Sequence, residues 1–422
     1  MRVGIARSLT DSASGGVFQY EVVFLKALGE IATRFPQELV YLCYNPADLV
    51  TLAGAGEGLT YRGIPVLPFS KPAPQVQPPE TYTKQRPATP LPFDPHAVKF
   101  NYPGAEALEK NGVDLLMLLS PSIQAFSFRR PFVMPIFDLN HRLQPEFPEV
   151  SAFGETNARE YFYINTCKYA TLILVDSEAG KEDVLRFYGE LINEDRIRIL
   201  PMYPSIVERP HPKPEDLARV QTKYNLPKRY FFYPAQFWPH KNHKLIVQAV
   251  KLLAEQTGES VPVVFCGAYW TYTMAVNFQE IMGLAANLGV ADQIRYLGSV
   301  PDEDMAALYA LSAGLVMPTF FGPSNIPPLE AWHYGRPVIT SDIRGLREQS
   351  GDAALLVDPR SPQAMADAMK RLWRDEALCT TLVERGRKRL SSYSYEEYVE
   401  RLTVILNEAC ERVRAGCTPR YP

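Results

Sequence analysis

Long hydrophobic runs are missing from this sequence. No apolar stretch approaches the roughly 20 residues needed to cross a bilayer, and residues 2–6 read as a β-strand and not as part of a signal peptide. We therefore expect a cytoplasmic protein, and we leave open a weak peripheral association with the inner face of a membrane.

Paired cysteines and an excess of one charge are also missing. The 6 cysteines are scattered without a C-x-x-C pair, which argues against a disulfide framework or a zinc site. With 44 Lys and Arg against 47 Asp and Glu, the net charge is −3. A chain so close to neutral gives no electrostatic reason to expect nucleic acid as a partner.

Signatures of metal chemistry are absent or have a simpler explanation. The histidines show no H-E-x-x-H spacing, and no G-x-x-x-x-G-K-[ST] phosphate loop occurs. Asp302-Glu303-Asp304 has the letters of a metal-binding D-x-D motif, but it follows Pro301 and leads into an apolar helical pattern. Acidic side chains are favoured in a first helical turn, so we interpret these three residues as a helix start. We expect neither a metal nor another cofactor.

The sequence does contain a repeated alternation of short apolar runs and amphipathic helical patterns. Many of the runs are apolar on both faces, which is typical of parallel strands covered by helices on both sides. This alternation predicts α/β domains built on doubly wound parallel sheets. The expected strands are residues 3–6, 39–43, 115–119, 133–136, 171–175, 230–233, 261–266, 294–297, 314–317 and 338–340.

The length of 422 residues fits two such domains. Prolines crowd together at residues 201–214, as they often do between domains. We therefore expect an N-terminal domain at 1–205, a C-terminal domain at 206–394 and a terminal helix and tail at 395–422. A proline-rich insertion at 68–103 breaks the alternation; it is either a plain surface loop or part of an acceptor site.

The strongest functional signal lies in residues 318–340, which read as a loop, a helix, a turn and a strand. The loop contains Gly322, Ser324 and Asn325, and two prolines follow in the first helical turn. A helix start presents N–H groups and the positive end of a dipole, which suits a diphosphate. Glu330 follows about one turn later, where its carboxylate could accept hydrogen bonds from ribose hydroxyls. A plain crossover with a solvated glutamate would give the same spacing.

Five segments resemble, in the same order, the motifs of retaining family 4 glycosyltransferases, which have the GT-B fold. They are Gly15-Gly16-Val17, Asp138-Leu139-Asn140-His141 and residues 233–243, 295–301 and 318–339. The resemblance implies two Rossmann-like doubly wound domains, with the C-terminal helix crossing back to the N-terminal domain.

The resemblance also implies transfer, with retention, of a hexose-type sugar from a UDP- or GDP-sugar to a hydroxyl acceptor. The product would be a glycan, a polysaccharide, a lipid-linked saccharide or a small glycoside. Lys241, Asp138 and His141 would be the catalytic residues. The donor would contact Gly15, Gly16, Gln236, Lys241, Gly298, Val300, Gly322, Ser324, Asn325, Ile326 and Glu330.

Three positions depart from the family pattern. Gly322 stands where the family has the first of two glutamates, and Gln236 stands where a second basic residue is common. Phe137 replaces a histidine before Asp138, so we expect His141 to supply the imidazole. Asp138 could alternatively cap its own loop. A non-catalytic nucleotide-sugar-binding partner subunit therefore stays open as an alternative.

Overall fold

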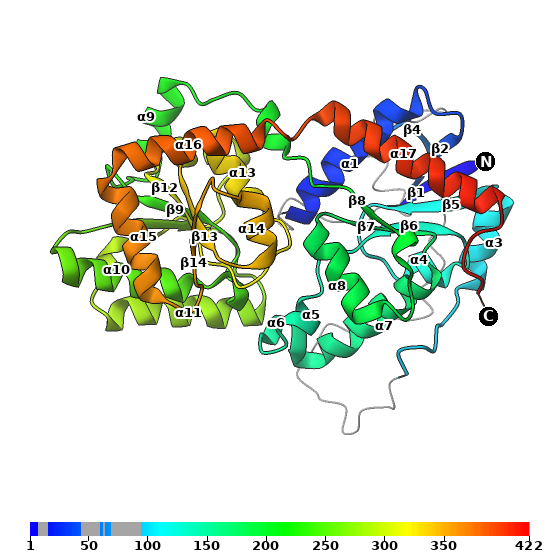
Figure 1. The fold of residues 1–422 in the computed structure, drawn as a ribbon, viewed down its shortest axis with the longest axis horizontal. Helices are drawn as coiled ribbons and strands as arrows, with labels where there is room; N and C mark the ends of the chain where they lie inside the picture. The colour runs from blue at the N-terminus through cyan, green and yellow to red at the C-terminus, as the bar shows by residue number, and fades with distance from the viewer. Residues whose placement is uncertain (7–15, 44–59, 62–63, 69–93, 422) are drawn as a thin grey trace. The chain divides into compact units, whose positions relative to one another are not determined.

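The computed structural model describes residues 1–6, 16–43, 60–61, 64–68 and 94–421. It divides into two compact units, each built around one sheet (Figure 1). Unit 1 comprises Met1–Leu139, Phe153–Pro201 and Tyr395–Pro422, and unit 2 comprises Asn140–Ala152 and Met202–Ser394. No helix within these described ranges is long and apolar enough to cross a membrane.

Unit 1 contains a sheet in the order β3-β4-β2-β1-β5-β6-β7-β8. Its strands are β1 (Arg2–Ala6), β2 (Glu38–Cys43), β3 (Thr60–Tyr61), β4 (Ile64–Pro68), β5 (Val113–Leu118), β6 (Phe132–Pro135), β7 (Leu172–Val175) and β8 (Ile197–Ile199). All neighbours pair in parallel except β3 and β4 at one edge. The order reverses at β1, which pairs with both β2 and β5.

Helices cover both faces of the unit 1 sheet, so its strands are apolar on both sides. Figure 1 shows α1 (Gly16–Ala32) and α17 (Tyr395–Arg414) on one face, and α4 (Gln124–Ser127), α7 (Glu155–Tyr169) and α8 (Glu178–Tyr188) on the other. Helix α3 (Tyr102–Lys110) packs on β5. Two ion pairs attach α17 to β8 and the turn before it: Arg198 to Glu408 (2.7 Å) and Arg412 to Asp195 (3.2 Å). The expected return of the C-terminal helix to the N-terminal domain is therefore confirmed.

Unit 2 contains a sheet of six parallel strands in the order β11-β10-β9-β12-β13-β14. The strands are β9 (Phe231–Pro234), β10 (Val263–Cys266), β11 (Ile294–Tyr296), β12 (Gly314–Met317), β13 (Val338–Ser341) and β14 (Leu355–Val357). Numbered from β9, this is the 3-2-1-4-5-6 order of a doubly wound nucleotide-binding fold. The predicted fold class is confirmed for this unit.

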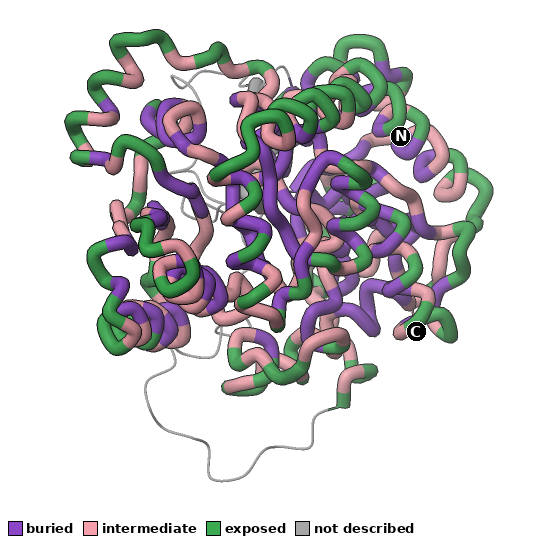
Figure 2. Tube along the Cα trace, turned by 60° about the vertical axis from the view of Figure 1, so that its left-hand side comes forward, coloured by how far each residue is buried: buried purple, intermediate pink, exposed green. Residues whose placement is uncertain are grey.

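The helices of unit 2 form a layer on each face of its sheet (Figure 1). One layer holds α10 (His243–Thr257), α11 (Tyr272–Asn287) and α15 (Pro362–Arg374), and the other holds α9 (Pro214–Lys223), α12 (Asp302–Leu311), α13 (Ile326–His333) and α16 (Glu376–Leu390). Between the layers the strands are buried, as Figure 2 shows, and Phe231, Phe232 and Tyr233 of β9 are 0% exposed. The unit also includes α5 (Asn140–Leu143), α6 (Pro148–Ser151) and α14 (Arg344–Ser350).

Two features bear on the domain limits expected from the sequence. The chain passes from unit 1 to unit 2 after Pro201 and back after Ser394, but residues Asn140–Ala152 also group with unit 2. Most of the proline-rich insertion, residues 69–93, lies outside the described residues, so both interpretations of it stay open.

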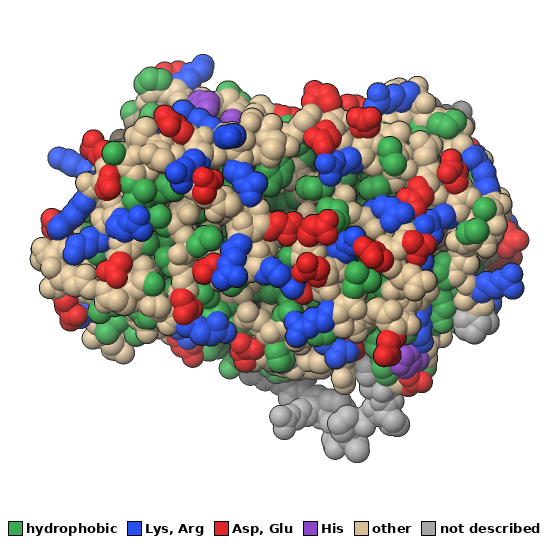
Figure 3. Space-filling view, in the orientation of Figure 1, with side chains coloured by type: hydrophobic (Ala, Val, Ile, Leu, Met, Phe, Trp, Pro, Cys, Tyr) green, Lys and Arg blue, Asp and Glu red, His purple; other side chains and the backbone are tan. Residues whose placement is uncertain are grey.

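On the face shown in Figure 3, basic and acidic side chains are interspersed, in keeping with the net charge of −3.

Candidate functional site

The candidate site lies at the carboxyl ends of β9 and β12. The strand order of unit 2 reverses between these two neighbours, and ligands of open α/β sheets bind outside the strand ends at such a switch point. The loops that follow the two strands, residues 235–242 and 318–325, contact each other there. The N–H of Phe320 donates to the carbonyl of His240 (2.8 Å), and the side chain of Asn242 donates to the carbonyl of Pro318 (3.0 Å).

The loop after β9 holds the main chain of Lys241 in place. The hydroxyl of Tyr233, at 0% exposure, donates to the carbonyl of Lys241 (2.9 Å). Asn242 adopts a left-handed conformation with φ of 59°, which asparagine tolerates better than most residues, and α10 begins directly after it. Gln236 accepts a hydrogen bond from the indole N–H of Trp238 (2.9 Å).

The start of α13 offers fewer N–H groups than the sequence suggested. The main-chain N–H of Asn325, the N-cap residue, donates to Oε1 of Gln349 (3.1 Å), whose amide donates back to the Asn325 carbonyl (2.7 Å). Pro327 and Pro328 have no N–H. The amide of Ile326 is therefore the donor that this helix start presents for an anion.

Gly322 has a backbone conformation that excludes a side chain. Its φ is +140°, and a Cβ at this position would lie 2.2 Å from Nδ2 of Asn325. The same amide group lies 3.5 Å from the carbonyl oxygen of Gly322. The loop therefore requires glycine here, with the Asn325 side chain in the space that a side chain would need.

Glu330 lies on the first turns of α13 and is half-buried. The hydroxyl of Tyr309 on α12 donates to its Oε2 (2.6 Å). Burial raises the pKa of Glu330 above its ordinary value, although the bond from Tyr309 opposes the shift. The other carboxylate oxygen is the one that a ligand hydroxyl could reach.

The loops after β9, β10 and β11 pack main chain against main chain. Gly267, after β10, donates its N–H to the carbonyl of Gly298 (3.0 Å), and a Cβ on Gly267 would lie 2.2 Å from the carbonyl oxygen of Ala235. Gly298 has a positive φ of 77°. Val300 follows it, two residues before α12 begins. The structure thus brings Gln236, Lys241, Gly298 and Glu330 to one edge of one sheet.

Residues 215–389, which contain this edge, match the family model described as glycosyl transferases group 1. The chain is a glycosyltransferase. The O-antigen chain mannosyltransferase B of Escherichia coli is 29% identical over 304 residues, which cover 67% of this chain and 77% of that protein. A D-inositol 3-phosphate glycosyltransferase of Salinispora arenicola is 27% identical over 236 residues, and the match covers 52% of each chain.

Solved structures confirm the GT-B fold of this glycosyltransferase. The crystal structure of Anabaena HepE in complex with UDP and glucose matches with a TM-score of 0.69, covering 96% of this chain and 99% of that one. A glycosyltransferase from Rickettsia africae matches with a TM-score of 0.66, covering 97% and 98%. At 16% and 15% identity, these likenesses concern the fold alone.

The predicted catalytic residues of the N-terminal half of the glycosyltransferase divide between the two units. Asp138 follows β6 in unit 1, where its carboxylate pairs with the guanidinium of Arg159 on α7 (3.1 Å). His141 lies on α5, which groups with unit 2, and is 2% exposed. Gly15 lies outside the described residues, and Gly16 is the first residue of α1.

The D-x-D letters of the glycosyltransferase are a helix start, as predicted. Helix α12 begins at Asp302 with three acidic residues in its first turn. The carboxylate of Asp304, at 0% exposure, accepts hydrogen bonds from Arg219 (2.6 Å), Lys223 (2.6 Å) and Tyr224 (2.7 Å) of the α9 segment. These contacts attach α9 to α12 and account for the buried aspartate.

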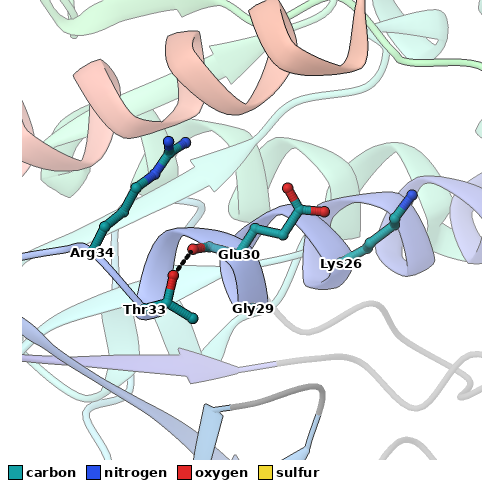
Figure 4. A pocket seen from close by; sticks show the side chains of 5 residues that line it. All are labelled: Lys26, Gly29, Glu30, Thr33 and Arg34. Carbon is teal, nitrogen blue, oxygen red and sulfur yellow. Dashed lines mark hydrogen bonds between the residues drawn. The ribbon is translucent and has the colours of Figure 1, made fainter.

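A cavity of about 520 Å³ lies elsewhere, at the C-terminal end of α1 (Figure 4). It is lined by Lys26, Gly29, Glu30, Thr33 and Arg34. Because α1 runs back from the carboxyl end of β1 to the start of β2, this cavity is at the opposite edge of the unit 1 sheet from the strand carboxyl ends. We therefore do not assign the donor to it.

Proposed function

We propose that this glycosyltransferase moves a hexose-type sugar, with retention of configuration, from a UDP- or GDP-sugar to a hydroxyl of a saccharide, lipid-linked or small-molecule acceptor during glycan synthesis. The observation that carries the proposal is the switch point of unit 2. There the β9 and β12 loops hydrogen-bond to each other beside the start of α13, and Glu330 follows on that helix. The relative named O-antigen chain mannosyltransferase B supports this reading.

Lys241, Glu330 and Ile326 are the proposed contacts to the nucleoside diphosphate. The Lys241 ammonium and the Ile326 N–H would offset the negative charge of the diphosphate. The free oxygen of the Glu330 carboxylate would accept from a ribose hydroxyl. Main-chain groups at Gly298 and Val300 would contact the base, and Gln236 would complete the donor contacts of unit 2.

Gly322, we propose, occupies the place of the first of the family's two glutamates. Its φ of +140° and the neighbouring Asn325 amide explain why no carboxylate stands there. The donor sugar would then be held by main-chain groups around Ser324, Asn325 and Ile326, or by the Asn325 side chain, in place of that carboxylate.

The proposed reaction breaks the bond between the anomeric carbon and the phosphate oxygen of the donor. The transition state resembles an oxocarbenium ion, and negative charge builds on the departing diphosphate. Lys241 and the α13 amide would stabilise that charge without a metal. The acceptor hydroxyl would attack from the same face and give its proton to the leaving phosphate. Asp138 and His141 would orient the transferred sugar or the acceptor hydroxyl.

Thermal unfolding in the presence of UDP, GDP and ADP tests the donor proposal, because a ligand that binds only the folded protein raises the melting temperature. We expect UDP or GDP to raise it and ADP not to. The matching UDP- or GDP-sugars would then be assayed for transfer and slow hydrolysis. Nucleotide binding with neither reaction would favour the non-catalytic subunit, and no shift with any nucleotide would contradict the donor site.

A further inference from the structure

Residues Asn140–Ala152 leave the fold of unit 1 and belong to unit 2. They carry two short helices, α5 and α6. Within unit 2 these residues contact the loops after both β9 and β12, the two loops of the switch point.

Glu149 on α6 binds the β9 loop through His240. Its Oε1 accepts two hydrogen bonds, one from the main-chain N–H of His240 (3.0 Å) and one from Nδ1 of the imidazole (2.7 Å). The side chains of Glu149 and His240 are only 6% and 15% exposed. Burial alone would raise the pKa of Glu149, but the bonds from the side chain and main chain of His240 outweigh burial and hold it below its ordinary value. The carboxylate is therefore ionised at neutral pH.

Gln144 and Phe147 bind the β12 loop at Phe320. The side-chain amide of Gln144 donates to the carbonyl of Phe320 (2.8 Å). The ring of Phe147 lies 5.3 Å from the ring of Phe320 and 6.3 Å from that of His240, measured between centroids. Helix α6 thus binds the β9 loop, Gln144 between α5 and α6 binds the β12 loop, and the ring of Phe147 lies beside both loops.

These contacts form a closed ring of hydrogen bonds because the two loops also bind each other. The N–H of Phe320 donates to the carbonyl of His240 (2.8 Å). The ring of hydrogen bonds therefore runs from Glu149 to His240, from His240 to Phe320 and from Phe320 to Gln144, which lies in the same segment as Glu149, Asn140–Ala152. Lys241 is the next residue after His240, and Gly322 is two residues after Phe320.

We propose that Glu149 is a positioning residue of the donor site: through His240 it fixes the main chain that carries Lys241 against the loop that leads to α13. Gln144 does the same for Phe320. The inference rests on the proposed donor function of these loops. Its physical basis is that a hydrogen bond to a buried carboxylate is charge-assisted, and that removing the carboxylate takes away the acceptor shared by the main-chain N–H and Nδ1 of His240.

The test compares Glu149→Ala, Glu149→Gln and Gln144→Ala with wild-type protein in calorimetric titrations with UDP and GDP. We expect Glu149→Ala to weaken binding of the nucleotide that wild type prefers by about tenfold. Glu149→Gln keeps an oxygen that can accept from His240 and should recover most of that loss. Gln144→Ala, which removes one bond to Phe320, should weaken binding by a smaller factor and serves where Glu149→Ala folds poorly.

A control variant and two further measurements separate positioning from general stability. Glu280→Ala is the matched control, because Glu280 pairs with Lys244 (2.6 Å) in the same unit but both side chains are about half exposed; it should leave nucleotide affinity unchanged. In steady-state transfer assays, Glu149→Ala should raise the KM of the donor and leave the KM of the acceptor unchanged. In a His240→Ala background, the effect of Glu149→Ala should shrink, because the two side chains act together.

The outcomes distinguish this inference from the function on which it rests. If wild type bound neither UDP nor GDP, the proposed function and this inference would both be overturned. If wild type bound one of them and folded Glu149→Ala and Gln144→Ala bound it equally well, the inference alone would be overturned.

Discussion

Glu330 is a half-buried carboxylate with a raised pKa, caused first by burial and opposed by the bond from Tyr309. A raised folded-state pKa means that the folded protein holds this proton more tightly than the unfolded chain does. The free energy of unfolding therefore falls as pH rises from the ordinary carboxyl pKa through the raised one. Glu330→Gln removes this effect, and its amide oxygen can still accept from Tyr309.

We predict that ligand-free Glu330→Gln melts at a higher temperature than wild type at pH 8, and that the difference narrows as the pH approaches 4. Thermal unfolding across this pH range measures it. A wild type that is the more stable protein at pH 8 would contradict the assignment of the raised pKa.

Replacing Glu330 is expected to weaken nucleotide binding, although it raises the melting temperature at pH 8. Glu330→Ala should weaken binding of UDP or GDP by roughly 1.5–3 kcal/mol, the range for hydrogen bonds to a charged group. Isothermal titration calorimetry measures this, with Glu384→Ala on the exposed side of α16 as the control. Equal affinities of Glu330→Ala and wild type would refute the ribose contact.

Asp138 and His141 are proposed to act on the transferred sugar or the acceptor hydroxyl and not on the nucleotide. Asp138→Asn loses an ion pair with Arg159 in which both side chains are about 30% exposed, so it should change stability little. We predict that Asp138→Asn and His141→Ala each lower turnover and leave nucleotide affinity nearly intact. Turnover at the wild-type rate in both folded variants would remove these residues from the mechanism.

Residues within one motif were predictable from the sequence, and their distant partners were not. The spacing from Gly322 to Glu330 placed both at the β12–α13 connection, where the structure has them. The bond from Tyr309 to Glu330 joins residues 21 apart, and the bonds from His240 to Glu149 join residues 91 apart. Such pairs depend on how elements pack, which local patterns do not encode.

At the scale of elements, the loop that leads into α13 depends on Gly322. A Cβ at this position would collide with the Asn325 amide at 2.2 Å, and the backbone φ of +140° is strained for any other residue. We predict that Gly322→Ala lowers both the donor affinity and the rate of transfer. The matched control is Gly283→Ala on α11, where a Cβ would meet nothing within 4 Å and where alanine should stabilise the helix by roughly 0.5–1 kcal/mol. An active Gly322→Ala with normal affinity would show that the loop has another accessible conformation.

All ten strands expected from the sequence are strands of the structure, but within the described residues four further strands were not predicted. Those four are β3, β4, β8 and β14. Strand β4 contains Pro65 and Pro68, which normally argue against a strand, and the other three have only two or three residues. All four lie at or next to the sheet edges, where strands are short and apolar runs give little signal.

For the whole molecule, the expected independence from metals remains to be tested. Asp304 already has three hydrogen-bond donors from the α9 segment, and within the described ranges no three His, Cys, Asp or Glu side chains are grouped as a metal site requires. We predict that transfer continues at an undiminished rate in excess EDTA and does not respond to added Mg²⁺ or Mn²⁺. Loss of transfer in EDTA and its recovery with either ion would show that the diphosphate is bridged by a metal.

Helix α17 has a consequence for the order in which the chain acquires its structure during synthesis. Its buried side chains, Leu402, Leu406 and Ala409 among them, pack in unit 1, most of which is translated before unit 2. Domains usually fold as units in the order in which they are made. Here the fold of unit 1 cannot be completed until residues 395–414 have been translated. Until then the apolar side chains that face α17 stay uncovered on the growing chain, so the unit that begins first is finished last.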